Sequence, residues 1–319
     1  MKINVGIVGY GNLGKAVEKC LVSNPKFNLK AIFSRRLVKS KLGTIIEPYS
    51  EFINYKSKVD VMILCSGSKS DLIIQSPEIL EHFDIINTFD THAKIVQEYK
   101  KLNIIAKKHN HRAIICCGWD PGLFSIIRAL FFAISNKEPI TFWGRGLSMG
   151  HSDAIRQVAN VDDGVQFTIP IKESIEKAKK DTLEKTDFLH KRECYVCAKE
   201  KHYKQIEKDI KNIANYFKGQ PTKVNFVPQE KVMKLKLNTS HKGFIFSSFK
   251  TKSNTKSQME FKVIMKSNPD FTASIVVAYI TAILNLKKQN KSGAFTPLEI
   301  SPNLLFEDDK FEKLLKTIC

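Results

Sequence analysis

The sequence predicts an α/β fold in which a doubly wound parallel sheet is followed by an α+β domain with a mostly antiparallel sheet. Three observations indicate this. Short, nearly continuous apolar runs alternate with helical segments over the first third of the chain, as in parallel strands covered by helices on both faces. A glycine-rich turn joins the first apolar run to the first helical segment. Beyond residue 140, strand-like runs follow one another with amphipathic segments among them.

The first domain is expected over residues 1–120. Its predicted strands are residues 3–9, 29–35, 59–67, 84–90 and 112–122, and its predicted helices are residues 11–24, 71–83 and 93–110. The strands are apolar almost throughout, and the first helix opens at glycines. A parallel sheet of this kind binds ligands at the carboxyl ends of its strands.

The second domain is expected over residues 121–269. It begins with an apolar helix over residues 124–135, and its predicted strands are residues 141–146, 165–171, 193–198, 222–227, 243–249 and 259–266. A last apolar helix, about residues 270–290, is expected to pack back onto the first domain, and residues 291–319 form a C-terminal segment.

The composition favours a cytoplasmic protein with no membrane segment and no metal. In the 319 residues no apolar run approaches the roughly 18 needed to cross a bilayer, and no signal peptide is visible at the N-terminus. The seven cysteines are expected to be reduced thiols because their number is odd and their spacing irregular. The single CxxC, Cys194 to Cys197, is interpreted as alternating strand positions.

The formal charge of +19 raises the alternative of a protein that binds nucleic acid. Most of the basic residues are lysines, which interleave with acidic residues at i,i+4 spacing as on solvated helix faces. The few arginines lie beside motifs, which suggests that geometry rather than bulk charge requires them. We therefore expect no specific nucleic-acid partner.

The turn Gly9-x-Gly11-x-x-Gly14 follows a predicted strand and opens a helix, the context of a Rossmann-type dinucleotide site. Gly9 permits the tight turn, Gly11 lets the backbone approach a pyrophosphate, and Gly14 allows the helix and the strand to pack closely. The pyrophosphate is then expected at the helix N-terminus, where free N–H groups and the helix dipole favour anions.

Ser34, Arg35 and Arg36 end the second predicted strand, where an NAD-binding protein usually carries a carboxylate. A carboxylate would repel a 2′-phosphate, whereas a hydroxyl and two forked guanidinium groups suit a phosphate dianion. These residues therefore predict NADP as the cofactor.

The later strand ends carry further candidates. Small residues at 65–68 suit backbone that lines a nicotinamide ribose, and Asp90, Trp119 and Asp120 follow the next two strands. Two carboxylates and a large aromatic side chain at neighbouring strand ends are suited to a cationic amine beside the nicotinamide. Taken singly, Asp90 and Asp120 are equally explained as loop caps.

Six segments together resemble the diaminopimelate dehydrogenase family: "GYGNLGKAVEK", "FSRR", "CGWDPGLFSI", "TFWGRGLSMGHSDAIR", "HKRECYV" and "NPDFTAS". The resemblance covers nearly the whole chain. It implies a reversible, NADP-dependent oxidative deamination of the D-centre of meso-2,6-diaminopimelate to L-2-amino-6-oxopimelate, which cyclises to tetrahydrodipicolinate, and ammonia, in lysine and diaminopimelate biosynthesis. It also implies a homodimer, with the second domain binding the substrate and the partner subunit.

The resemblance also implies which residues form the site. The cofactor contacts are Gly9, Tyr10, Gly11, Asn12, Leu13, Gly14, Ser34, Arg35, Arg36, Cys65, Ser66, Gly67, Ser68, Thr88, Phe89, Asp90, Cys117, Gly118, Trp119, Asp120 and Pro121. The substrate contacts are Asp90, Asp120, Trp143, Met149, Gly150, Thr168, Arg192, His241 and Asn268. The catalytic candidates are Asp120, then Asp90, which accept a proton from the amine, with Trp119 beside them.

Individually, several of these residues have ordinary structural explanations. Arg192 lies in a basic segment, Trp143 is typical of a core, Thr168 can face solvent, and His241 is typical of an exposed turn. Two alternatives for the whole chain stay open: an NADP-dependent oxidoreductase of the same plan with a sugar or semialdehyde substrate, and a non-catalytic NADP-sensing or nucleic-acid-binding protein.

Overall fold

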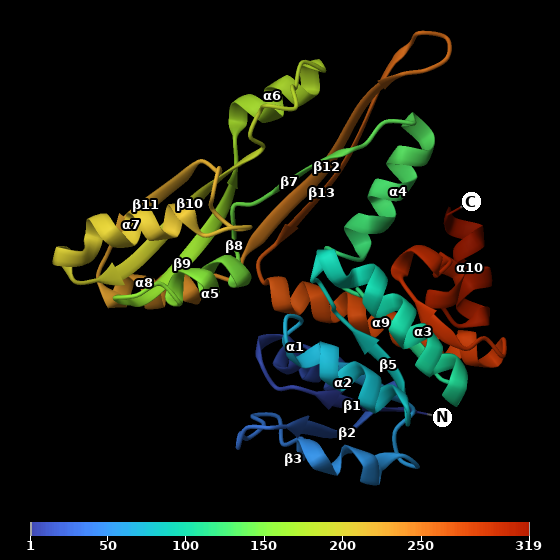
Figure 1. Ribbon diagram of the computed structural model, residues 1–319. Coiled ribbons are helices and arrows are strands. Elements are labelled where there is room, and N and C mark those ends of the chain that lie inside the picture. Colours follow the sequence, from blue (N-terminus) through green and yellow to red (C-terminus); the bar gives the residue numbers. More distant parts are fainter. Residues whose placement is uncertain (1, 319) are drawn as a thin grey trace. The chain divides into compact units, whose positions relative to one another are not determined.

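The computed structural model describes residues 2–318, which divide into two compact units (Figure 1). One unit runs to Ile126 and resumes at Pro269, and the other is Ile127–Asn268. The division after Ile126 falls within helix α4 (Leu123–Ser135), a few residues beyond the boundary expected from the sequence.

Within residues 2–318, the first unit has one sheet of seven parallel strands in the order β14-β6-β5-β4-β1-β2-β3. The strands are β1 (Ile3–Val8), β2 (Phe27–Ser34), β3 (Ile46–Pro48), β4 (Val61–Leu64), β5 (Asp84–Asn87), β6 (Arg112–Ile114) and β14 (Gly293–Phe295). The doubly wound sheet is thus confirmed. The sequence missed β3 and β14 because three residues leave no readable pattern.

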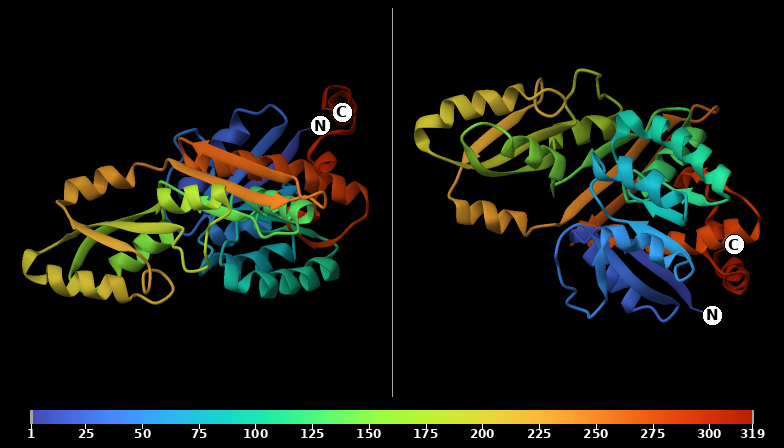
Figure 2. Two further views of the ribbon diagram at one scale, coloured as in Figure 1. Left: turned by 90° about the horizontal axis from the view of Figure 1, so that it is seen from above. Right: turned by 60° about the horizontal axis from the view of Figure 1, so that its bottom comes forward.

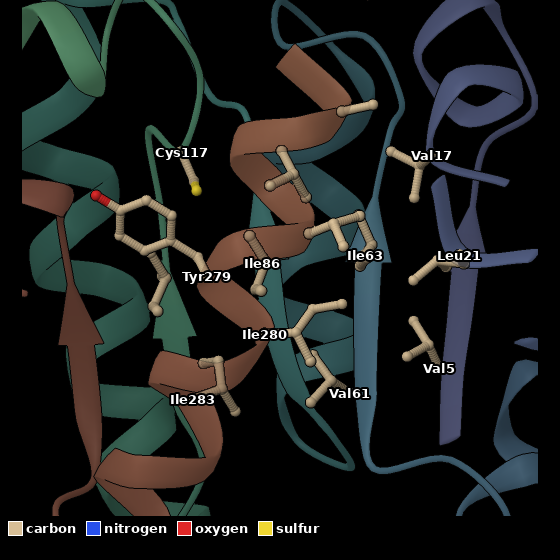
Figure 3. Close-up of a cluster of buried hydrophobic side chains, with 14 of the residues drawn as sticks. Val5, Val17, Leu21, Val61, Ile63, Ile86, Cys117, Tyr279, Ile280 and Ile283 are labelled. Atoms are coloured by element: carbon tan, nitrogen blue, oxygen red, sulfur yellow. The ribbon is translucent and has the colours of Figure 1, made fainter. Parts of the chain in front are cut away.

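Helices cover both faces of this sheet. Alternate residues of the strands point to opposite faces: Val61 and Ile63 pack with α1 (Asn12–Val22) and α9 (Asn268–Lys288), whereas Met62 and Leu64 pack with α2 (Asp71–Leu80) and α3 (Ile95–His109). Figure 3 shows the α1 and α9 side of the core. Full burial of each such aliphatic side chain contributes roughly 1.5–3 kcal/mol.

Helix α9 corrects one expectation from the sequence. Its 21 residues are long and apolar enough to cross a membrane by length and composition alone, although the sequence reading found no such segment. Its apolar side chains, among them Ile280 and Ile283, are buried against the sheet, as in a core helix (Figure 3).

The turn between β1 and α1 depends on the backbone conformation of Gly9 and on a close backbone approach at Gly14. Gly9 has φ +89°, a left-handed conformation that glycine adopts without strain. A Cβ at Gly14 would lie 2.2 Å from the carbonyl oxygen of Gly9, so only glycine lets α1 start this close to the strand end. A Cβ at Gly11, by contrast, would meet no atom within 4 Å.

In the part of the chain that the structure describes, the second unit is mostly antiparallel, which confirms the expectation, but its strands form two sheets rather than one. One has the order β11-β10-β9-β8 and the other the order β13-β12-β7. All pairs are antiparallel except β10 with β11, and β12 and β13 run side by side along their length (Figure 2). The strands are β7 (Ile140–Trp143), β8 (Gly146–Leu147), β9 (Val161–Pro170), β10 (His190–Ala198), β11 (Thr222–Phe226), β12 (His241–Lys250) and β13 (Lys256–Met265).

The remaining helices are α5 (Met149–Arg156), α6 (Lys172–Lys180), α7 (Tyr203–Asn212), α8 (Gln229–Lys236) and α10 (Asp308–Ile318), with short 3-10 helices at Tyr49–Tyr55, His92–Lys94, Glu200–His202, Pro297–Glu299 and Pro302–Leu305. Cys194 and Cys197 both lie in β10, which confirms their interpretation as strand positions.

Substitution by alanine at Gly14 and at Gly11 is expected to have different effects on the free energy of unfolding. Gly14→Ala should lower the free energy of unfolding by about 1–3 kcal/mol, because the new methyl group overlaps the Gly9 carbonyl. Gly11→Ala should change it by no more than about 1 kcal/mol, since open space surrounds that position. Urea denaturation of both variants measures the difference, and equal losses would contradict the close-packing role of Gly14.

Candidate functional site

The carboxyl ends of β1, β2 and β4 meet at a cavity of about 360 Å³ in the first unit. Residues 9–11, 34–36 and 65–67, all predicted as cofactor contacts, line it. Phe33, Tyr49, Asp71 and Gln75 also line it and were missed, because they carry no motif and come from separate segments. The tertiary structure thus brings the core of the predicted cofactor set together.

The glycine turn gives this cavity an anion-binding edge. The backbone at Gly11 faces open space, whereas Gly14 is covered by the Gly9 carbonyl, so only the former is accessible to a ligand. Gly11 is the N-cap of α1, whose first N–H groups have no partner within the helix. The edge therefore suits a pyrophosphate, as the sequence predicted for it.

The segment after β2 forms a compact turn held by Ser34. The Ser34 hydroxyl donates to the carbonyl oxygen of Arg36 at 3.0 Å and accepts from the Arg36 N–H at 3.1 Å. Its proton is thus used within the turn, so the hydroxyl shapes the loop that presents the arginines.

The two arginines beside this turn differ in their contacts. Arg35 forms an ion pair with Asp71, 2.7 Å from Nη2 to Oδ2, and 60% of its side chain is exposed. Arg36 donates from Nη2 to the carbonyl oxygen of Tyr10 at 3.4 Å. A guanidinium has five donors, so both arginines retain N–H groups for an anion in the cavity.

Beyond the ends of β5 and β6, some of the predicted cofactor residues can offer only backbone atoms to a ligand. Phe89 and Cys117 have fully buried side chains in the core, so only their backbone is available to a ligand. Asp90 is exposed, and its N–H donates to the Ser68 hydroxyl at 2.8 Å, which joins the ends of β4 and β5. Ser68 and Thr91 hydroxyls lie 3.3 Å apart beside them.

The segment after β6 folds into a tight turn. The N–H of Gly118 donates to the carbonyl oxygen of Pro121 at 3.0 Å, and the Asp120–Pro121 peptide is cis. Trp119 is buried, with its ring edge-to-face against Phe124 at 5.1 Å between centroids. The indole is thus held against helix α4, and Asp120 is only partly buried.

Of the remaining cofactor candidates, Asn12 is exposed at the start of α1 and Leu13 packs partly against the core, while Thr88 is partly buried after β5.

In the second unit, neighbouring strands place Gly146, Thr168 and Arg192 side by side. Gly146 pairs with Thr168 between β8 and β9, and Thr168 pairs with Arg192 between β9 and β10. Arg192 donates from Nη1 to the Thr168 hydroxyl at 2.9 Å, and Gln166 donates to the same oxygen at 3.3 Å. Thr168 is buried and therefore does not face solvent.

Arg192 lies in surroundings that are short of negative charge. Among the side chains that the structure describes, no carboxylate forms an ion pair with it, and its Nε is buried without a hydrogen-bond partner. Burial, followed by the charge of Arg192, lowers the pKa of His151 and of His190 to about 4. Both imidazoles are therefore neutral near pH 7, and Arg192 is the charged group of this cluster.

Trp143 and His241 are held close to this cluster. The backbone N–H of Trp143 donates to His190 Nε2 at 2.8 Å, and the two rings lie 5.2 Å apart between centroids. His241 begins β12, is 8% exposed and contacts the carbonyl oxygen of Lys242 through Nδ1 at 2.9 Å. Its description as an exposed turn histidine is therefore wrong.

Gly146 explains how the histidine fits. A Cβ at Gly146 would lie 2.0–2.4 Å from ring atoms of His241, so the imidazole occupies the space that the missing side chain leaves. The sequence did not single out Gly146, His151 or His190, since each makes its contacts only after the strands pair.

The other predicted substrate residues lie on further elements. Met149 and Gly150 are exposed in the first turn of α5, beside a 2.8 Å contact between Ser148 Oγ and His151 Nδ1. Asn268 opens α9, and its N–H donates to the Thr239 carbonyl oxygen at 2.9 Å. Asp90 and Asp120 belong to the first unit.

The chain is similar to a group of proteins that share one name. Residues 118–267 match the family model described as diaminopimelic acid dehydrogenase C-terminal domain. The chain is 40% identical to the meso-diaminopimelate D-dehydrogenase of Acetivibrio thermocellus over 320 residues, which cover 95% of this chain and 94% of that one. It is 39% identical to the enzyme of the same name from Ureibacillus thermosphaericus, with 95% of each chain covered.

Solved structures give the same result. The structure of C. glutamicum DAP dehydrogenase in complex with DAP matches with a TM-score of 0.93 and 34% identity, covering 100% of this chain and 99% of that one. An engineered D-amino acid dehydrogenase bound to NADP+ matches with a TM-score of 0.89 and 33% identity over 100% of both chains. By its sequence, its fold and the residues assembled in its two units, this chain belongs to the diaminopimelate dehydrogenase family.

Proposed function

We propose that this chain catalyses the reversible, NADP-dependent oxidative deamination of the D-centre of meso-2,6-diaminopimelate. The products are L-2-amino-6-oxopimelate, which cyclises to tetrahydrodipicolinate, ammonium and NADPH. The observation that carries the proposal is Arg192, a partly buried guanidinium whose Nε lacks a partner and beside which no described carboxylate forms an ion pair. A charge that is removed from water in part is costly unless an anion pairs with it, and an amino diacid supplies such an anion.

The residues of the first unit fit NADP. Gly11 leaves open space for a pyrophosphate at the start of α1, and Arg35 and Arg36 line the same cavity. At the ribose position the chain offers guanidinium groups that attract a 2′-phosphate. The engineered D-amino acid dehydrogenase that matches this chain has NADP+ bound, which supports the same cofactor here.

The two ends of the substrate are assigned to different groups. The Arg192 fork, with the Thr168 hydroxyl and the His241 imidazole, holds one carboxylate, because a guanidinium binds a carboxylate in bidentate fashion. The backbone amides at Met149 and Gly150 hold the other, and Trp143 and Asn268 line the site. Asp90 and Asp120 hold ammonium groups.

The reaction removes a hydride from carbon and a proton from nitrogen, and water then replaces the nitrogen. The bound dinucleotide supplies the hydride acceptor. Asp120 accepts the proton from the amine, with Asp90 as the second candidate, since the nitrogen must become neutral before the hydride can leave. Trp119 forms a fixed wall beside them, with its ring packed on Phe124.

Stereospecificity follows from holding both ends. With the two carboxylates fixed, only one configuration at the reacting carbon presents its hydrogen to the acceptor. A substrate without the distal amino acid would leave buried polar groups unpaired, which is costly.

We further propose that the protein is cytoplasmic and works as a homodimer. Helix α4 supports the second proposal: Leu130, Phe132 and Ile134 are large apolar side chains that are 52%, 48% and 64% exposed. Leu130 and Ile134 share one side of the helix and Phe132 lies on the other, so apolar surface is exposed on more than one side. Exposed apolar surface of this kind is suited to a subunit interface.

The function is tested by assaying NADP reduction with the three stereoisomers of diaminopimelate at alkaline pH. We expect turnover with the meso isomer and none with the L,L isomer, which lacks a D-centre. We expect little turnover with the D,D isomer, whose distal centre has the D instead of the L configuration. Absence of turnover with the meso isomer, together with turnover of a sugar or a semialdehyde, would refute the assignment.

Loss of both arginines should change the nucleotide preference. Arg35→Ala combined with Arg36→Ala should raise the KM for NADP by about 10- to 100-fold, as expected for charge-assisted hydrogen bonds, and change the KM for NAD far less. The control is Lys107→Ala with Lys108→Ala, which removes the same charge from exposed positions on α3. Equal effects on both nucleotides would contradict the phosphate role.

Arg192→Ala should raise the KM for diaminopimelate by about 100-fold or more, because one carboxylate of the bound substrate would lose its ion-pair partner. The dissociation constant for NADP, measured by calorimetry, should stay the same. Arg192→Lys keeps the charge but loses the fork, so we expect an intermediate KM. A loss of NADP affinity instead would show that the residue is assigned to the wrong part of the site.

A further inference from the structure

Glu18 is a buried carboxylate that lies outside the set of residues discussed so far. It belongs to α1 and is only 1% exposed. Its Oε2 accepts a hydrogen bond from the Tyr10 hydroxyl at 2.5 Å, and its Oε1 accepts one from the Ser40 hydroxyl at 2.5 Å. Buried glutamates are rare unless they are paired, so this arrangement needs an explanation.

The two hydroxyls come from two of the loops that contribute residues to the cavity at the ends of β1, β2 and β4. Tyr10 lies between Gly9 and Gly11 in the glycine turn. Ser40 lies in the loop that follows β2 and carries Arg35 and Arg36. Both oxygens of one carboxylate thus join the pyrophosphate side of the cavity to the arginine side.

Further contacts support this connection. Arg36 donates to the carbonyl oxygen of Tyr10, and the N–H of Leu42 donates to the Ser40 hydroxyl at 2.9 Å. Burial, followed by the hydrogen bond to Glu18, raises the pKa of Tyr10, so its hydroxyl keeps the proton that it donates. Among the described side chains, no lysine or arginine forms an ion pair with Glu18, so hydroxyl donors stabilise its charge.

We propose that Glu18 is a positioning residue for NADP, which holds the glycine turn and the arginine loop in the arrangement that binds the 2′-phosphate. The inference rests on the proposed use of NADP. Without the carboxylate, the nucleotide itself would have to order the loop, and that ordering would weaken binding. Because Glu18 acts on the phosphate-binding side chains, its loss should affect NADP more than NAD.

The test compares Glu18→Ala, Ser40→Ala and Glu18→Gln with the unmodified protein. Calorimetry measures the dissociation constants for NADP and NAD, and steady-state assays measure KM and kcat. We expect Glu18→Ala to weaken NADP binding about tenfold and Ser40→Ala about threefold, as expected for the loss of two hydrogen bonds and of one. The value of kcat at saturating NADP should change far less, and Glu18→Gln, which keeps one acceptor oxygen, should recover part of the affinity.

The chain offers a matched control. The Tyr99 hydroxyl donates to Glu299 at 2.8 Å, the same type of contact in the same unit but outside the cavity. Tyr99→Phe should leave both dissociation constants unchanged. Ser40→Ala decides the question if Glu18→Ala does not fold, because Ser40 is only partly buried.

Two results would overturn the inference: unchanged NADP affinity in Ser40→Ala and Glu18→Gln, or equal losses for NADP and NAD. Failure of the proposed function would look different. In that case the unmodified protein would show no preference for NADP over NAD, or would not turn over diaminopimelate.

Discussion

The interaction that organises the proposed site in the second unit is that of Arg192, a partly buried guanidinium with which no described carboxylate forms an ion pair. Arg192 is fixed by Thr168 on the neighbouring strand, and the histidines around it are kept neutral. A carboxylate on an adjacent strand would have neutralised the charge of Arg192 and taken the place of an anionic ligand. The strand pairing therefore leaves the guanidinium without an ion-pair partner among the described residues, and we assign that place to the anionic ligand.

In the first unit, the proposed nucleotide site combines backbone groups of the glycine turn with side chains of the loop after β2. The glycine turn presents N–H groups at a helix end, a site that any dinucleotide can use. We assign selectivity to the loop after β2, where Ser34 holds the turn that carries Arg35 and Arg36. The proposed role of Glu18 joins these two parts, since one buried carboxylate binds a hydroxyl from each.

The residues that the sequence missed share one property: their contacts depend on chain segments that are distant in sequence. Asp71 reaches Arg35 from a helix after β4, and His190 reaches Trp143 from another strand. Neither belongs to a short motif. In the same way β14 is recognisable as a strand only because β6 lies beside it, and the second unit's strands show no local sign that they form two sheets.

The sequence alone determined the local features: the glycine turn, the arginines after the second strand, the apolar strands and the family to which their combination belongs. These depend on backbone conformation and on periodicity, which neighbouring residues specify. Only the tertiary structure decided that His241 fills the space at Gly146, that no described carboxylate forms an ion pair with Arg192, and that Glu18 joins two loops. Burial and pairing are properties of the packed chain, because they depend on which distant segments exclude water from a side chain.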